Sequence, residues 1–165
     1  MTELAIPQNV LPAAAPEAME HIAAVERRIC EREEALPEES QFRPQMEHVL
    51  HAGMYARTCR LDAGVAIVSV LIKIPTMLIV HGGAHVYAGN RWYIIDGYQC
   101  MPASAGRKQI YLTFRPTEIT MVFPSKARTV EEAEAEFTDE AQALLSRRQD
   151  NGDITVATGV QACQA

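Results

Sequence analysis

Hydrophobic and polar positions divide the chain into a helical first part, a central part of short apolar strands and a helical last part. The longest apolar stretch covers residues 64–83 and contains one charge, Lys73, and one proline, Pro75. β-Branched residues suit a pleated, buried surface, whereas a proline ends a strand or confines it to an edge. A run of this length can also span a membrane. The charge and the proline in its middle instead favour two strands, 65–73 and 76–80.

Further short strands are predicted on both sides of this stretch. Residues 55–61 alternate polar and less polar side chains, as a half-buried strand does. The other predicted strands are 84–87, 91–95, 98–101, 108–114 and 118–123. Turns are expected at 82–83, 89–90, 96–97 and 115–117, and Asp96-Gly97 is the strongest hairpin signal because both central positions need a positive φ. About eight short strands at near-even spacing predict a mainly β fold, a small antiparallel barrel or jelly roll over residues 48–125.

The regions on either side of the strands have helical patterns. Residues 16–36 predict a helix that begins at Pro16 and carries a thin apolar stripe, with a charged face towards solvent. Residues 37–47 are a polar linker. Thr129 and Glu132 form a capping box, so two short helices are predicted within 126–150.

Both ends of the chain have weak patterns. Residues 1–15 contain two prolines and little charge, which predicts an extended or disordered arm. The alternative is an arm that becomes ordered on a neighbouring subunit. Residues 151–165 are interpreted as a tail or as one added strand.

Composition limits the functional classes. The 165 residues suit one domain. A net charge of −6 gives no reason to expect nucleic-acid or anionic-membrane binding. The four cysteines are scattered without a Cys-x-x-Cys pair, and no secretory signal is visible. We therefore expect free thiols and a cytoplasmic protein, or a component of a virus particle if a phage encodes it.

The strand region resembles the cupin superfamily over about residues 48–125. The glycine frame of the first cupin motif matches Gly64 and Gly83, and its three metal-ligand positions fall on Val70, Ile72 and Thr76. In the second motif the register is one residue short, and the fourth ligand position falls on Arg107 or its neighbour Lys108. The stretches MPASAGRKQ and ARTVEEAEAEFTDEA are also similar to cupin-like phage and prophage proteins of unknown role.

This resemblance implies a barrel without a metal or another cofactor. First-row metals need nitrogen, oxygen or sulfur donors, which Val70 and Ile72 lack, and Thr76 is a poor ligand. A cation at Arg107 would repel a divalent ion by several kcal/mol, taking about 4 Å and an effective dielectric constant of about 20. The alternative is that these side chains simply fill the interior.

Four residues are candidates for binding a small ligand. Arg107 and Lys108 can hold an anion such as a phosphate or a carboxylate, although such a pair also suits a solvated turn. Tyr111 and Trp92 can stack on a ring, although alternating aromatic residues are usually part of a core.

Two histidine pairs offer minimal metal sites. His81 and His85 flank a predicted turn, and His48 and His51 lie near the start of the barrel. Neither pair has a third ligand nearby in the sequence. No P-loop, dinucleotide-binding or nucleophile-elbow motif is present, and Ser104 is interpreted as a loop serine.

Three functional hypotheses follow. The first is a non-enzymatic, metal-free protein that acts by self-association and contact with other proteins, as a homo-oligomer, because helices outside a compact barrel need a surface to cover. The second is a barrel that binds a small anionic ligand, a nucleotide or a sugar. The third is a divergent metal enzyme that uses His81 and His85.

Overall fold

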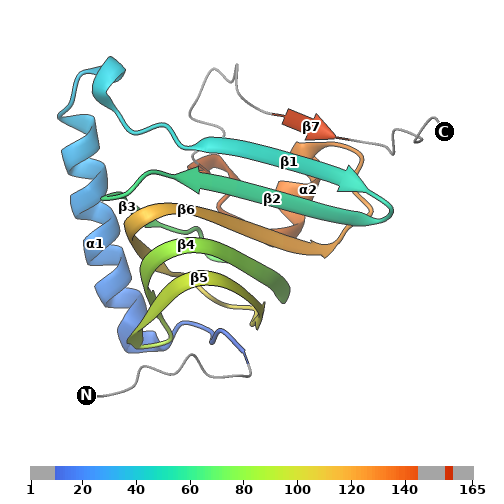
Figure 1. Ribbon diagram of the computed structural model, residues 1–165, viewed down its shortest axis with the longest axis horizontal. Helices are drawn as coiled ribbons and strands as arrows, with labels where there is room; N and C mark the ends of the chain where they lie inside the picture. Colours follow the sequence, from blue (N-terminus) through green and yellow to red (C-terminus); the bar gives the residue numbers. More distant parts are fainter. Residues whose placement is uncertain (1–9, 145–154, 158–165) are drawn as a thin grey trace.

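One curved β-sheet forms the body of the protein (Figure 1). The computed structural model describes residues 10–144 and 155–157. Its elements are α1 (Pro16–Glu34), η1 (Glu38–Ser40), β1 (Gln45–His51), β2 (Met54–Leu61), β3 (Ala66–Val68), β4 (Thr76–Ala88), β5 (Arg91–Ala103), β6 (Ile110–Pro124), α2 (Val130–Phe137), η2 (Ala141–Ala143) and β7 (Thr155–Ala157). The strand order is β5-β4-β6-β2-β1-β7, with β3 paired to β6. The mainly antiparallel, jelly-roll-like fold predicted from the sequence is confirmed, but the described strands do not close into a ring.

Three long strands bend together where short strands and turns were predicted. β4, β5 and β6 run without interruption through residues 82–83, 96–97 and 115–117. In the ladder Gly82 lies opposite Gly97, and Gly83 lies opposite both Asp96 and Arg115. The hairpin at Asp96-Gly97 was therefore wrongly predicted, whereas the turn predicted at residues 89–90 is confirmed and joins β4 to β5.

A close approach between strands explains the bend. Gly82 has φ 139°, and a Cβ placed on it would lie 2.3 Å from the carbonyl oxygen of Pro116 on β6. Only glycine allows both this backbone conformation and this contact. The glycine and proline signals thus mark a bend shared by neighbouring strands rather than chain reversals.

The apolar stretch 64–83 is only partly regular. The predicted strand 65–73 shrinks to β3, and a single bridge between Ile72 and Arg107 holds the segment that follows. β4 begins at Thr76, directly after Pro75, as predicted. β1 was not predicted, although its alternation of exposed and buried residues from Gln45 to His51 is the pattern of a half-buried strand.

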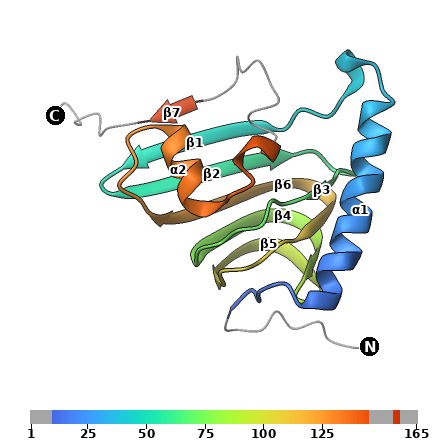
Figure 2. The ribbon, with the colours of Figure 1, turned by 180° about the vertical axis from the view of Figure 1, so that it is seen from behind.

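The helices cover the sheet of their own chain. α1 buries Ala18 and Ile22 beside Ile110 at one end of the sheet. α2 begins at the predicted capping box, in which the Thr129 hydroxyl accepts a hydrogen bond from the Glu132 amide at 3.2 Å. Figure 2 shows α2 and η2 lying across the sheet. The predicted second C-terminal helix is only the 3-10 turn η2, and residues 145–150 lie outside the described part. Among the described residues no helix is both long and apolar enough to cross a bilayer.

The described parts of both ends also contact the sheet. The Leu11 amide donates a hydrogen bond to the Pro102 carbonyl at 2.8 Å, and the Ser104 amide donates to the Leu11 carbonyl at 2.9 Å. The arm from residue 10 to residue 15 therefore lies against its own chain, and residues 1–9 are outside the description. β7 pairs in parallel with β1, so the tail contributes one added strand.

Candidate functional site

A partly open cavity of about 110 Å³, here called the interior cavity, lies between the sheet, the irregular segment after β3 and the end of α2. It is lined by side chains of β1, β2, β4 and β6, by residues 67–72, and by Phe137, Ala143 and Leu144. Most of this lining is aliphatic or aromatic. The polar lining side chains are Arg57, Ser69, Arg107, Gln109 and Tyr111.

Alternation along one extended segment creates the polar side of the cavity. Arg107, Gln109 and Tyr111 are two residues apart, so their side chains face the same way and all three line the cavity. Lys108 faces the opposite way, towards α1. The structure thus brings two of the four predicted ligand-binding residues together and adds Gln109, which the sequence analysis did not single out.

Trp92 lies away from this cavity. It is on β5, its side chain is 37% exposed, and its ring lies 5.2 Å from that of Tyr87. It is part of an apolar surface on the outside of the sheet.

Arg107 is the largest fully buried side chain among the described residues and is only 1% exposed. Its Nη1 donates to the Ser104 carbonyl at 2.8 Å, and its Nη2 donates to the Thr76 hydroxyl at 2.6 Å. None of the ion pairs among the described residues includes Arg107, and its Nε has no acceptor. Burial lowers the pKa of the Arg107 guanidinium, yet arginine stays protonated in proteins. A buried positive charge therefore faces neutral acceptors only.

Gln109 offers a second unused donor. The Tyr111 hydroxyl donates to Gln109 Oε1 at 2.9 Å, which leaves Gln109 Nε2 buried without an acceptor. Burial raises the pKa of Tyr111, so this hydroxyl keeps its proton at neutral pH. Buried N–H groups without partners are rare in folded proteins. Arg107 and Gln109 each contribute one to the same cavity.

No carboxylate side chain lines this cavity, although the chain is acidic overall. Its lining includes Arg57 and Arg107 but no Asp or Glu, whereas the whole chain has a net charge of −6. Burial also raises the pKa of Cys59, another lining residue, to about 11, so its thiol is neutral. The described lining therefore supplies no carboxylate to Arg107.

The positions to which the cupin resemblance assigns metal ligands lie at this cavity. Val70 and Ile72 line it, and Thr76 accepts the hydrogen bond from Arg107. Val70 and Ile72 offer no donor atom to a metal, and the Thr76 hydroxyl is already bound to a guanidinium. In the part of the chain that the structure describes, no group of three or more His, Cys, Asp or Glu side chains could hold a metal ion.

The predicted histidine pairs do not converge. His81 and His85 are both on β4, but the first lies beside the ring of Tyr98 and the second beside that of Phe114. His51 is exposed at the end of β1.

His48 is fully buried, and its Nδ1 lies 2.7 Å from the Tyr55 hydroxyl. Burial, with a smaller contribution from Arg57, lowers the pKa of His48 to about 4. The imidazole is therefore neutral at physiological pH.

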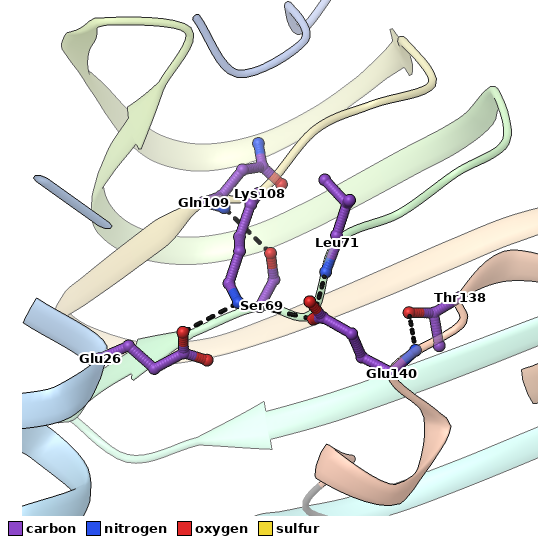
Figure 3. A network of polar contacts seen from close by, with 7 residues as sticks. All are labelled: Glu26, Ser69, Leu71, Lys108, Gln109, Thr138 and Glu140. Carbon is purple, nitrogen blue, oxygen red and sulfur yellow. Dashed lines mark hydrogen bonds and ion pairs between the residues drawn. The ribbon is translucent and has the colours of Figure 1, made fainter. Parts of the chain in front are cut away.

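Lys108 ties the wall of the cavity together from outside (Figure 3). Its ammonium group lies 2.9 Å from Glu26 of α1 and 3.5 Å from Glu140. Glu140 also accepts a hydrogen bond from the Leu71 amide at 3.0 Å, and the Lys73 amide donates to the Phe137 carbonyl. These bonds link the segment 69–73, which lines the cavity, to α1 and to the end of α2.

A larger groove of about 420 Å³ lies on the other side of this wall. It is lined by α1, by residues 38–43 and by β3. Ile67, Val68 and Ala143 line both the groove and the cavity. These three residues therefore separate the groove on the α1 side from the cavity.

Comparison with known proteins finds likeness in structure only. No family model matches the sequence, and no curated protein matches it. Similar solved structures include a cupin 2 conserved barrel domain protein from Leptotrichia buccalis, with 10% identity over 42% of this chain and 34% of that chain and a TM-score of 0.38.

Two further structures match more of their own length. KdgF from a Halomonas species shares 13% identity over 52% of this chain and 81% of that chain, with a TM-score of 0.43. A conserved protein with a double-stranded β-helix domain from Klebsiella pneumoniae shares 16% identity over 56% of this chain and 84% of that chain, also with a TM-score of 0.43. Cupin-domain proteins are thus among the solved structures that this chain is similar to, and the likeness is one of fold alone.

Proposed function

We propose that this protein binds a small anionic molecule in the interior cavity, with Arg107 as the main contact. The observation that carries this proposal is a guanidinium that is 1% exposed and has no carboxylate among its described partners. Burying a charge is costly unless an opposite charge or several hydrogen bonds compensate for it. An anion in the cavity would supply the missing charge and an acceptor for Arg107 Nε.

The groups around the cavity suit holding a ligand more than transforming it. Arg107 and Gln109 donate hydrogen bonds, and the raised pKa values of Cys59 and Tyr111 keep both of these groups protonated at neutral pH. A nucleophile or a general base needs a deprotonated group near the operating pH. Reversible binding is therefore the activity proposed.

Calorimetric titration of the full chain with acetate, butyrate, phosphate and sulfate, supported by thermal unfolding, tests this proposal. We expect at least one anion to bind and to raise the melting temperature, because a ligand at a hundred times its Kd stabilises the folded state by about 2.7 kcal/mol. Arg107→Met should remove the binding, and Arg60→Met is the control, since Arg60 lies in an exposed ion-pair network with Glu47 and Glu118. The absence of any bound anion would refute the proposal.

Self-association is a second candidate, and an exposed apolar surface supports it. Ile94 on β5 and Leu112 on β6 both lie opposite His85 on β4; Trp92 lies two residues before Ile94, and Phe114 lies two residues after Leu112. All four apolar side chains are 37–41% exposed. A second copy of the chain would cover this surface, whereas the helices that led to the hypothesis already cover their own sheet. Light scattering of the wild type and of Ile94→Glu tests it, and a monomeric wild type would contradict it. A role in a virus particle stays a prediction from the sequence.

A further inference from the structure

We infer that the ligand of the interior cavity is a small monocarboxylate with an apolar body, of the size of a short branched-chain fatty acid. This inference rests on the proposed anion binding and adds the chemical class of the anion. It follows from the volume of the cavity, from the distribution of its polar groups and from the number of its unused donors.

Volume limits the ligand to a few heavy atoms. The cavity measures about 110 Å³, and an apolar protein cavity of about 150 Å³ is enough for one benzene molecule. In proportion, this space holds about four to five non-hydrogen atoms, and because the cavity is partly open, the end of a slightly longer body can extend out of it. Nucleotides and sugars are too large for it to enclose.

The lining favours a ligand with one polar end and an otherwise apolar body. Arg107, Gln109 and Tyr111 form a continuous polar strip along one segment. The remaining walls are mainly hydrocarbon or thioether side chains, from Ile67, Val70, Ile72, Leu78, Ile119, Met121, Phe137 and Leu144. A hydroxylated acid would bury hydroxyl groups against these walls without partners, at a cost of about 1–3 kcal/mol for each group. A hydrocarbon body would instead gain about 0.8 kcal/mol for each buried methylene group.

The unused donors match the two oxygens of a carboxylate. Arg107 Nε and Gln109 Nε2 are the buried donors without acceptors on the polar strip. A carboxylate offers two oxygens to N–H groups and carries one negative charge, which balances one guanidinium. Phosphate carries more charge and more oxygens than these donors satisfy, and it would leave the apolar walls without contacts. A monocarboxylate therefore fits the strip and the walls together.

Calorimetric titration of the full chain with four matched compounds tests the inference. Isovalerate has the expected head and body, glycerate has a hydroxylated body of equal heavy-atom count, isovaleramide has the same body without the charge, and phosphate has charge without a body. We expect isovalerate to bind at least tenfold more tightly than each of the other three. Gln109→Leu should weaken isovalerate binding at least tenfold, and Arg107→Met should weaken it further.

The outcomes separate this inference from the proposed function. Binding of glycerate or phosphate as tight as that of isovalerate, lost in Arg107→Met, would overturn the inference and leave anion binding standing. The absence of binding by all three anions would overturn both. Equal binding of isovalerate and isovaleramide would overturn both, because the charge would then contribute nothing. If Arg107→Met does not fold, as circular dichroism would show, Gln109→Leu alone decides, and unchanged isovalerate binding in that variant would contradict the assignment.

Discussion

Arg107 and Lys108 are neighbours in the chain, both are buried, and their charges are balanced in opposite ways. Lys108 faces outwards and has two carboxylates within 3.5 Å, from Glu26 and Glu140. Arg107 faces inwards and has only carbonyl oxygens, a hydroxyl and a thioether as described partners. Among the described residues, Lys108 therefore has its counter-charges on the outside of this wall, whereas Arg107 has no carboxylate partner on the inside. This difference is the basis for placing an external anion in the cavity.

The choice of residue agrees with the two environments. Arginine presents five donors in a rigid, planar arrangement, which suits several acceptors at once in a buried site. Lysine carries a compact charge on a flexible stem, which reaches two carboxylates from a rim. We therefore expect that exchanging arginine and lysine between positions 107 and 108 would weaken the hydrogen bonds inside the cavity and the ion pairs outside it.

The largest expected effect comes from reversing the charge at each position. Arg107→Glu would place a carboxylate among the carbonyl oxygens of Ile74 and Ser104 and should lower the free energy of unfolding by about 4 kcal/mol. Lys108→Glu should cost about 2 kcal/mol, because it removes two ion pairs and adds a carboxylate beside Glu26 and Glu140, which are 35% and 42% exposed and can turn towards water. Urea unfolding of both variants measures the difference, and equal losses would remove the contrast.

A carboxylate side chain introduced into the cavity should compete with the ligand for Arg107. Gln109→Glu keeps the shape of the side chain and its bond to the Tyr111 hydroxyl, while it adds a negative charge to the lining that contains Arg107. We expect isovalerate affinity to fall about a hundredfold, or about 2.7 kcal/mol, because the fixed charge competes with the ligand. Titration calorimetry of Gln109→Glu beside wild type checks this. Retained affinity would mean that the anion binds elsewhere.

The buried imidazole of His48 makes the stability of the folded protein depend on pH. His48 has an ordinary pKa of 6.5, which burial lowers to about 4 in the folded protein. The unfolded chain then binds a proton that the folded chain does not, so stability falls as the pH drops from about 6.5 towards 4. Between pH 7 and pH 5 the wild type should lose about 2 kcal/mol more than His48→Asn. Parallel pH dependences in urea unfolding would contradict this.

The smallest expected effect is the loss of the outer ion pairs. Lys108→Met should lower the free energy of unfolding by about 1 kcal/mol, and less at high salt. Arg43→Met is the control, because its pair with Glu38 is 3.6 Å long and its own side chain is 53% exposed. Thermal unfolding at low and high salt distinguishes the two variants. If Arg43→Met lowers the free energy of unfolding as much as Lys108→Met does, the ion pairs of Lys108 contribute no more than an exposed surface pair.

Local patterns predicted the elements better than their connections. Pro16 and the Thr129 capping box placed the starts of α1 and α2, and Pro75 placed the start of β4. Gly82 and Gly97 were interpreted as turns because a positive φ is common in hairpins, and only the contact with Pro116 explains a bend within continuous strands. That contact joins residues far apart in the sequence, so no local pattern contains it.

The candidate site was predictable in part for the same reason. Arg107 and Tyr111 were found from residue type, and alternation alone would have added Gln109 and placed Lys108 on the opposite side. The missing counter-charge could not be predicted, because it depends on which distant residues line the cavity. Trp92 was grouped with these residues by chemistry, and the strand order places it on the outer surface instead.

A crystal structure of the full chain grown with 4-bromobutyrate tests the central claim most directly. The account predicts an anomalous bromine peak among the apolar walls of the interior cavity, with the carboxylate accepting hydrogen bonds from Arg107 Nε and Gln109 Nε2. A cavity that holds only water, or a ligand bound on the outer surface while Arg107 keeps its present contacts, would contradict it.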